Sequence, residues 1–102
     1  MKRNNFPLSP LEFELMAIIR RNPHQNGRQI AARHELWRHR PLSFGSLYTT
    51  LRRLIERKLV LKRSKLKRLK DNRKAVFRLS TRGRETLTKM RADLTRLAAF
   101  EA

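Results

Sequence analysis

The sequence has no cysteine in its 102 residues, which excludes disulfides, thiolate-ligated zinc sites and a thiol nucleophile. Glycine occurs only at Gly27, Gly45 and Gly83, a spacing that excludes a phosphate-binding glycine loop. No apolar run is long enough to cross a membrane, and residues 1–7 lack the apolar stretch of a secretory signal. We therefore expect a protein of the cytoplasm with no membrane partner.

Acidic residues are also scarce, since 8 Asp and Glu stand against 26 Lys and Arg, a formal net charge of +18. A compact domain with this charge repels itself unless a polyanion neutralises part of it. A basic surface on a heat-stable protein is the alternative, but such surfaces gain glutamate and lysine together. The composition favours nucleic acid as the partner, because each neutralised phosphate releases counterions.

Neither the carboxylates nor the histidines form a catalytic or metal-binding pattern. Glu12 and Glu14 are two positions apart and do not share a helical face. His24, His34 and His39 lack the spacing of paired metal ligands. We therefore predict no enzyme activity, no catalytic residues, no metal site and no cofactor.

Three helices are predicted in the first half of the chain. A capping-box pattern starts a first helix over residues 10–21. A second helix is predicted over residues 28–38, with Trp37 on or near its buried face. Apolar side chains in steps of three and four predict a third helix over residues 44–58, with Ser43 as its N-cap.

Strand-forming residues then replace the helical spacing. Residues 59–61 and 75–79 are predicted to pair as a hairpin, and a last helix follows. This order predicts a mostly α fold with a two-stranded β-wing: a winged helix-turn-helix plus a C-terminal dimerisation helix. At this length we expect one compact domain, in which residues 1–80 bind DNA and residues 81–102 form the dimerisation helix.

The third helix is the candidate for reading DNA, because a recognition helix lies in the major groove. Short polar groups can reach bases or phosphates, and arginine can contact guanine with two hydrogen bonds. A solvated polar face on an amphipathic helix is the alternative. The predicted DNA-binding residues of this helix are Ser43, Ser46, Tyr48, Thr49, Thr50, Arg52, Arg53 and Arg57.

The predicted hairpin carries eight cations within thirteen residues. A wing with this charge would follow the phosphate backbone or enter a minor groove, which adds affinity but little sequence information. Lysines also protect exposed strand edges from aggregation, but two or three would be enough for that. The predicted DNA-binding residues of the wing are Lys62, Arg63, Lys65, Lys67, Arg68, Lys70, Arg73 and Lys74.

The last helix has an apolar stripe that can pack either on its own domain or on a second subunit. A core of three helices leaves little room for a fourth of about twenty residues, so we favour pairing between two subunits. A homodimer would also place two recognition helices about one DNA turn apart. The predicted interface residues are Leu87, Met90, Leu94, Leu97 and Phe100.

Two segments resemble the signature of PadR-like transcriptional regulators. Residues 43–54 contain Gly-Ser-Leu-Tyr followed by Leu-x-x-Leu, as in that family's third helix. Residues 77–83 are similar to the family's Tyr-x-Leu-Thr-x-x-Gly at the exit of the wing. The likeness extends over residues 11–97. The family usually has glycine before the Leu-Val of the wing entry, where this chain has Lys58.

The resemblance implies a winged helix fold that dimerises through its C-terminal helix, with help from the first helix, and represses by binding an operator. It places Ser46, Tyr48, Thr49 and Thr50 at the DNA surface, and it implies that Gly83 lets the last helix begin close to the wing. We expect a sequence-specific regulator of double-stranded DNA in the nucleoid. A non-specific architectural DNA-binding protein and a winged-helix RNA-binding component of a ribonucleoprotein remain alternatives. The sequence does not establish a small-molecule effector.

Overall fold

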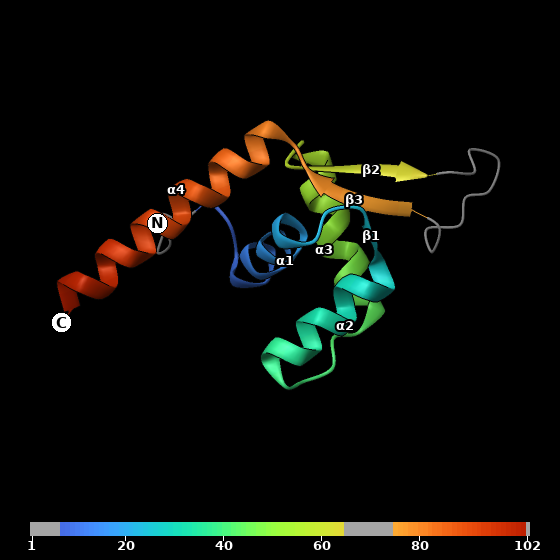
Figure 1. Ribbon diagram of the computed structural model, residues 1–102, viewed down its shortest axis with the longest axis horizontal. Helices are drawn as coiled ribbons and strands as arrows, with labels where there is room; N and C mark the ends of the chain where they lie inside the picture. Colours follow the sequence, from blue (N-terminus) through green and yellow to red (C-terminus); the bar gives the residue numbers. More distant parts are fainter. Residues whose placement is uncertain (1–6, 65–74, 102) are drawn as a thin grey trace.

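The computed structural model describes residues 7–64 and 75–101 of the chain. Four helices and three short strands follow one another, and the strands form one antiparallel sheet (Figure 1). This arrangement confirms the predicted winged helix-turn-helix with an added C-terminal helix. In chain order the elements are α1 (Pro10–Arg21), β1 (Gln25–Asn26), α2 (Gly27–Arg38), α3 (Phe44–Glu56), β2 (Val60–Ser64), β3 (Ala75–Leu79) and α4 (Thr81–Glu101).

The starts of the first three helices are fixed by side-chain caps. The Ser9 hydroxyl accepts from the Glu12 amide at 3.2 Å, and the Glu12 carboxylate accepts from the Ser9 amide at 2.8 Å. Asn26 and Gln29 form the same reciprocal pair at the start of α2. At α3, Ser43 accepts from the Ser46 amide. These bonds satisfy amides that have no partner within the helix, so each start is well defined.

The sheet has one more strand than predicted. β3 lies in the middle, pairing with β2 from Val60↔Leu79 to Ser64↔Ala75, and with β1 on its other edge. β1 is only two residues long, too short to show the alternation of polar and apolar residues that identifies a strand. It ties the start of α2 to the sheet, because Gln25 is opposite Phe77 in the register.

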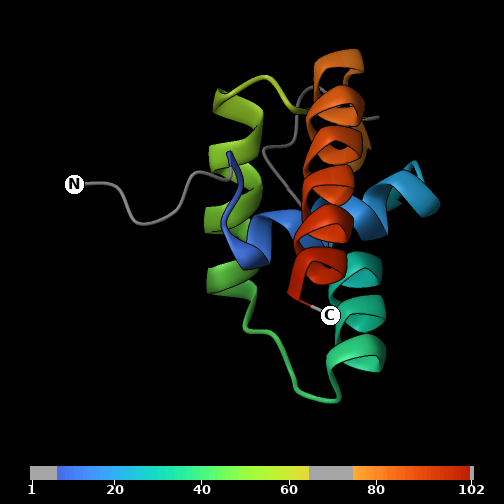
Figure 2. The same cartoon turned by 90° about the vertical axis from the view of Figure 1, so that its left-hand side faces the viewer.

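The core lies where α1, α3, the sheet and the first half of α4 meet. Leu15, Ile19, Leu47, Phe77 and Leu87 are each at most 2% exposed. Figure 2 shows α4 running across α1, and α3 packs against both α1 and α2. The core therefore positions α3 with one face buried and the other turned outward.

The end of α3 explains the unusual residue at the wing entry. The Leu59 amide donates to the Leu54 carbonyl and the Lys58 amide donates to the Ile55 carbonyl, both at 2.9 Å. This pair of bonds is a Schellman motif, in which the residue after the cap is left-handed and is most often glycine. Lys58 takes that conformation with φ 61°. The helix therefore ends at Glu56, two residues before the predicted end.

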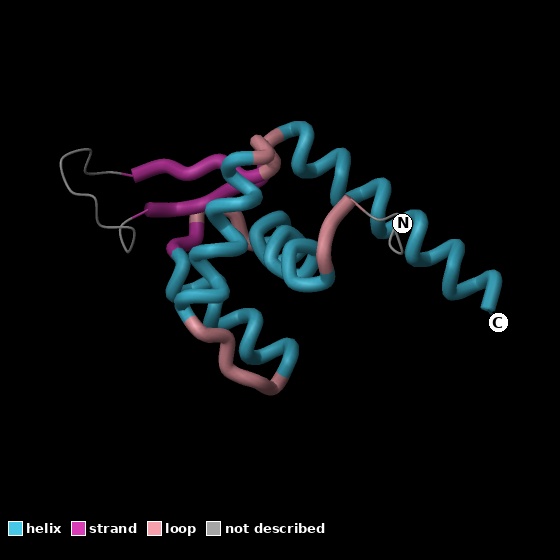
Figure 3. Tube along the Cα trace, turned by 180° about the vertical axis from the view of Figure 1, so that it is seen from behind, coloured by secondary structure: helices cyan, strands magenta, loops and turns pink. Residues whose placement is uncertain are grey.

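Gly83 allows α4 to begin directly against the start of the wing. A Cβ atom at this position would lie 2.0 Å from the carbonyl oxygen of Leu59. The contact confirms what the resemblance implied for this glycine. From there α4 runs away from the hairpin, so the wing and the end of α4 project in opposite directions (Figure 3).

Candidate nucleic-acid interface

The outward face of α3 carries much of the predicted reading surface. The side chains of Ser46, Thr49, Arg52 and Arg53 are exposed. Gly45 lies among them, and the nearest atom to a Cβ built there is the Ser43 hydroxyl at 4.0 Å. This surface, which we call the α3 face, combines two cations, two hydroxyl groups and a stretch of bare backbone. It offers donors and acceptors where a helix would approach a groove.

Thr50 was predicted on this surface, but the structure places it on the opposite side of the helix. It is 6% exposed and lies between Leu47 and Leu54 in the helical spacing, so it belongs to the buried stripe. A buried hydroxyl cannot reach a base or a phosphate, so Thr50 is removed from the predicted DNA contacts.

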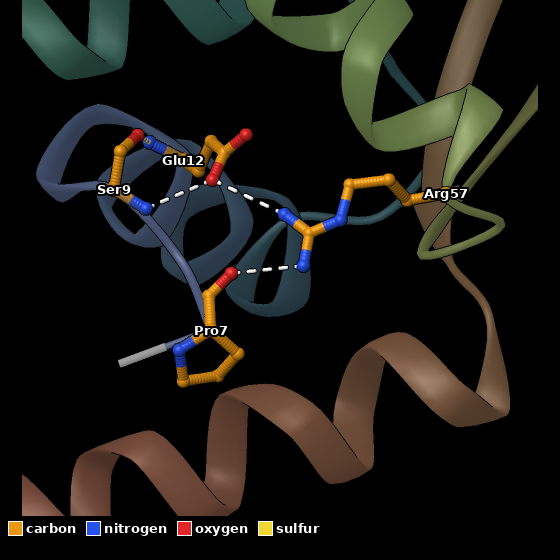
Figure 4. Close-up of polar contacts among 4 residues, drawn as sticks. All are labelled: Pro7, Ser9, Glu12 and Arg57. Carbon is orange, nitrogen blue, oxygen red and sulfur yellow. Dashed lines mark hydrogen bonds and ion pairs between the residues drawn. The ribbon is translucent and has the colours of Figure 1, made fainter. Parts of the chain in front are cut away.

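Arg57 was also predicted to contact DNA, but its guanidinium is engaged within the protein. It follows α3 as the C-cap residue and reaches the beginning of α1 (Figure 4). One nitrogen lies 3.3 Å from the carboxylate of Glu12, and another donates to the carbonyl of Pro7 at 2.8 Å. The same carboxylate accepts from the Ser9 amide. Arg57 therefore links the end of α3 to the start of α1.

Ser43 and Tyr48, which were predicted to contact DNA, make contacts within the protein. Ser43 is exposed, but its hydroxyl caps α3. Tyr48 is half-buried, and its hydroxyl would lie 2.3 Å from a Cβ on Gly27. The absence of a side chain at Gly27 lets α2 and α3 approach each other here. Tyr48 therefore packs in the helix-turn-helix contact, which limits how far it can reach toward DNA.

Two residues at this surface were missed. Phe44, the first residue of α3, is 50% exposed, and the guanidinium of Arg28 lies 6.0 Å from the centre of its ring. The helical spacing gave no signal for Phe44, because this residue lies three positions before Leu47 and continues the stripe of Leu47, Leu51 and Leu54. The contact with Arg28 joins two helices and has no counterpart in the sequence pattern.

The described part of the wing contributes two of the predicted cations. Lys62 and Arg63 lie on β2 with exposed side chains, opposite Phe77 and Val76 of β3. The adjacent Arg78 of β3 is also exposed. These cations extend the positive charge from the α3 face onto the hairpin. The other predicted wing residues, Lys65, Lys67, Arg68, Lys70, Arg73 and Lys74, lie outside the described residues.

The apolar stripe of α4 is divided between the core and the surface. Leu87 and Met90 are 0% and 4% exposed and pack within their own chain, so they cannot also meet a second subunit in this arrangement. Leu94 is half-buried, while Leu97 and Phe100 are 45% and 88% exposed. The accessible part of the predicted interface is therefore the end of the helix.

Trp37 is not the core residue that the helical spacing predicted, since it is 59% exposed. It lies at the rim of an open groove of about 920 Å³, which we call the α1/α4 groove. Arginines surround this largely apolar groove. Its lining includes Leu8, Phe13, Ala17, Ile18, Arg20, Arg33, Trp37, Met90, Arg91 and Leu94.

Beside this groove, α1 and α2 are joined by a histidine–carboxylate pair. The Nε2 atom of His34 lies 2.8 Å from a carboxylate oxygen of Glu14. Within residues 7–64 and 75–101 no three His, Asp or Glu side chains gather as a metal site would require. None of the helices in these ranges has the length and apolar character needed to cross a bilayer.

Comparisons with known proteins agree with this architecture. No model of a known protein family matches the chain, and no curated protein matches it. Among solved structures, the PcaV transcriptional regulator from Streptomyces coelicolor, in complex with its natural ligand, matches with a TM-score of 0.72 at 16% identity, over 89% of this chain and 58% of that one. A MarR family transcription regulator matches with a TM-score of 0.72 at 18% identity, over 92% and 57%.

Streptococcus pneumoniae FabT, solved in complex with DNA, matches with a TM-score of 0.67 at 17% identity, over 95% of this chain and 62% of FabT. The chain has a winged helix fold. At these identities the likeness is one of fold. This winged helix chain spans 57% to 62% of the length of the three regulators.

Proposed function

We propose that this winged helix protein is a sequence-specific DNA-binding transcriptional regulator of the PadR-like type, acting as a repressor. The observation that carries the proposal is the α3 face, where Ser46, Thr49, Arg52 and Arg53 surround the bare backbone of Gly45 on the outer side of a recognition helix. FabT, a structure of the same fold, was solved with DNA, which supports double-stranded DNA as the partner.

The distribution of charge supports the same partner. Two acidic side chains of α1, Glu12 and Glu14, face Arg57 and His34 inside the protein. The exposed cations of α3 and β2 include Arg52, Arg53 and Arg63. With α3 in the major groove, its arginines would lie near the phosphates that border the groove, and β2 would lie along the phosphate backbone, as recognition helices and wings do.

We further propose a homodimer in which the end of α4 packs into the α1/α4 groove of a second copy. In an isologous dimer the same surface of both subunits forms the interface, so this surface must be complementary to itself. The chain carries both parts: an apolar groove beside Phe13 and Trp37, and an apolar helix end at Leu97 and Phe100. Burying these two side chains would remove exposed apolar area from water and pair the two recognition helices.

Selection from a pool of random duplex DNA tests the main proposal. The selected duplex is then titrated against a scrambled duplex and duplex RNA, at low and near-physiological salt. A preference for the selected duplex that survives the higher salt supports the proposal. Equal, salt-sensitive binding to both DNAs would show an architectural protein, because backbone contacts alone are strongly screened. Preference for RNA would show a ribonucleoprotein component.

Two charge-matched variants sharpen the test. Arg53→Met removes a cation from the α3 face, and Lys89→Met removes one from an exposed position on α4. Arg53→Met should lower affinity for the selected duplex and reduce the salt slope by about 0.9, if the lost contact is to a phosphate. Lys89→Met should change neither. Equal effects of the two substitutions would show that net charge alone drives binding.

The dimer is tested by sedimentation equilibrium of Phe100→Glu. Its control, Ala99→Glu, makes the same charge change at the neighbouring exposed position, which lies about 100° around α4 from Phe100 and on the side away from Leu97. Phe100→Glu should shift the wild-type dimer to monomer, while Ala99→Glu should stay dimeric. A monomeric wild-type protein, or a dimer that both variants retain, would contradict the proposed interface.

A further inference from the structure

An exposed aromatic residue occupies the first position of the recognition helix. Phe44 directly follows the N-cap Ser43 and is 50% exposed. The three leucines that anchor α3 in the core, Leu47, Leu51 and Leu54, are at most 1% exposed. The anchoring of the helix therefore does not depend on Phe44. Its exposed half leaves an apolar surface at the start of the helix that is open to a contact outside the protein.

The ring of Phe44 is held in place from two sides. On α3 itself, Tyr48 lies one turn later, with its ring centre 6.4 Å from that of Phe44 and the planes at 45°. From α2, the guanidinium of Arg28 lies 6.0 Å from the ring centre, within reach of a cation–π contact. The contacts reduce the freedom of the ring while one side stays exposed. An aromatic group oriented in this way is prepared for a contact outside the protein.

The surroundings of Phe44 point to a DNA base as that contact. Residues near the N-terminus of a recognition helix reach base edges in the major groove. The only apolar group that a base pair presents there is the C5-methyl of thymine, and phenylalanine is one of the side chains that contact it. Arg28, on the first turn of α2, would at the same time face the phosphate backbone.

We infer that Phe44 reads a thymine methyl group in the major groove and is a specificity-determining residue. The inference rests on the proposed function and names one base that α3 selects. The exposed arginines and the serine of the α3 face bond polar base edges, and Thr49 offers the thymine methyl only a single methyl group of its own. Phe44 presents the larger apolar surface for this contact.

The experiment uses the full chain and the duplex obtained by selection. Each thymine in turn is replaced by deoxyuridine, which lacks the C5-methyl and keeps the base pairing. Wild-type protein should bind about fourfold more weakly when the contacted methyl is missing, the effect of one buried methyl group. In a symmetric dimer, replacement in both half-sites should weaken binding about 16-fold, the square of that effect.

The same titration with Phe44→Ala assigns the effect to this ring. The variant should bind the thymine and deoxyuridine duplexes equally. The loss of affinity from removing the ring and the loss from removing the methyl group then do not add, because both remove the same contact. Leu36→Ala removes another exposed apolar side chain, 75% exposed on α2, and should keep the wild-type sensitivity. Because Phe44 is half-exposed, its variant should unfold near the wild-type temperature, which excludes a folding defect as the cause.

The outcomes separate this inference from the proposed function. If selection gives no preferred duplex, sequence-specific regulation fails and the role of Phe44 fails with it. If a duplex is selected but no deoxyuridine replacement weakens binding, only the role of Phe44 is overturned. The same conclusion follows if Phe44→Ala keeps the full sensitivity to the missing methyl group.

Discussion

Replacing Gly83 by alanine should destabilise the protein strongly, although alanine is the better helix former. The added Cβ would lie 2.0 Å from the carbonyl oxygen of Leu59 and 3.0 Å from its carbonyl carbon. Both are backbone atoms, so no side-chain rotation can relieve the overlap. Since ordinary contacts of carbon are about 3.5 Å, α4 would have to move away from the wing entry by more than an ångström.

That movement breaks the hydrogen bonds that join α4 to the end of α3. The Ser80 amide donates to the Leu59 carbonyl at 3.0 Å, and the Ser80 hydroxyl donates to the Lys58 carbonyl at 2.7 Å. Losing both costs about 2 kcal/mol, and overpacking adds about 1–3 kcal/mol. The higher helix propensity of alanine returns about 1 kcal/mol. We expect a net loss of about 3 kcal/mol.

Urea unfolding and thermal unfolding at fixed protein concentration measure this loss. A destabilisation of about 3 kcal/mol should lower Tm by about 12 °C or more in a domain of this size. Gly45→Ala is the matched control, because its Cβ meets nothing closer than 4.0 Å and should change stability by less than about 1 kcal/mol. Equal Tm values for Gly83→Ala and wild type would refute the argument from the Leu59 contact.

Three further predictions concern the end of α3 and its contact with α1. Arg57→Met should lower the free energy of unfolding by about 1–2 kcal/mol, since the hydrogen bonds to Glu12 and Pro7 are partly exposed, and it should leave the salt slope of DNA binding unchanged. Glu12→Gln should cause a smaller loss of stability, because the amide oxygen can still accept from the Ser9 amide. A reduced salt slope for Arg57→Met would show instead that Arg57 contacts DNA. Lys58→Gly should raise stability by about 0.5–1 kcal/mol in urea unfolding, because φ 61° strains lysine and not glycine. A loss of stability would contradict the strain.

The sequence was sufficient to predict elements with strong local signals. The capping box at Ser9 and the N-cap at Ser43 gave the starts of α1 and α3, and the run 75–79 gave β3. Thr50 could have been assigned correctly as well, because it lies three residues after Leu47 and four before Leu54. Its polar side chain suggested the surface, but its spacing put it in the buried stripe.

Long-range contacts could not be predicted in the same way. Arg57 meets Glu12 across 45 positions in the sequence, so no local pattern distinguishes it from Arg53, whose side chain is exposed on the α3 face. Trp37 has the spacing of a core residue, but it borders the open α1/α4 groove, where its side chain stays 59% exposed. Apolar spacing identifies a candidate core face, while neighbouring elements decide how much of that face is covered.

The packing of α3 limits the number of its side chains that are free for the proposed DNA contact. One side is committed to the core through Leu47, Leu51 and Leu54, and a second packs against α2, where Tyr48 covers Gly27. Any shift of α3 that brought more side chains to DNA would open the core. In the proposed complex, specificity would therefore come from the remaining narrow face and from how deeply α3 enters the groove. Close entry requires little bulk on this face, and Gly45 meets that requirement near the start of α3.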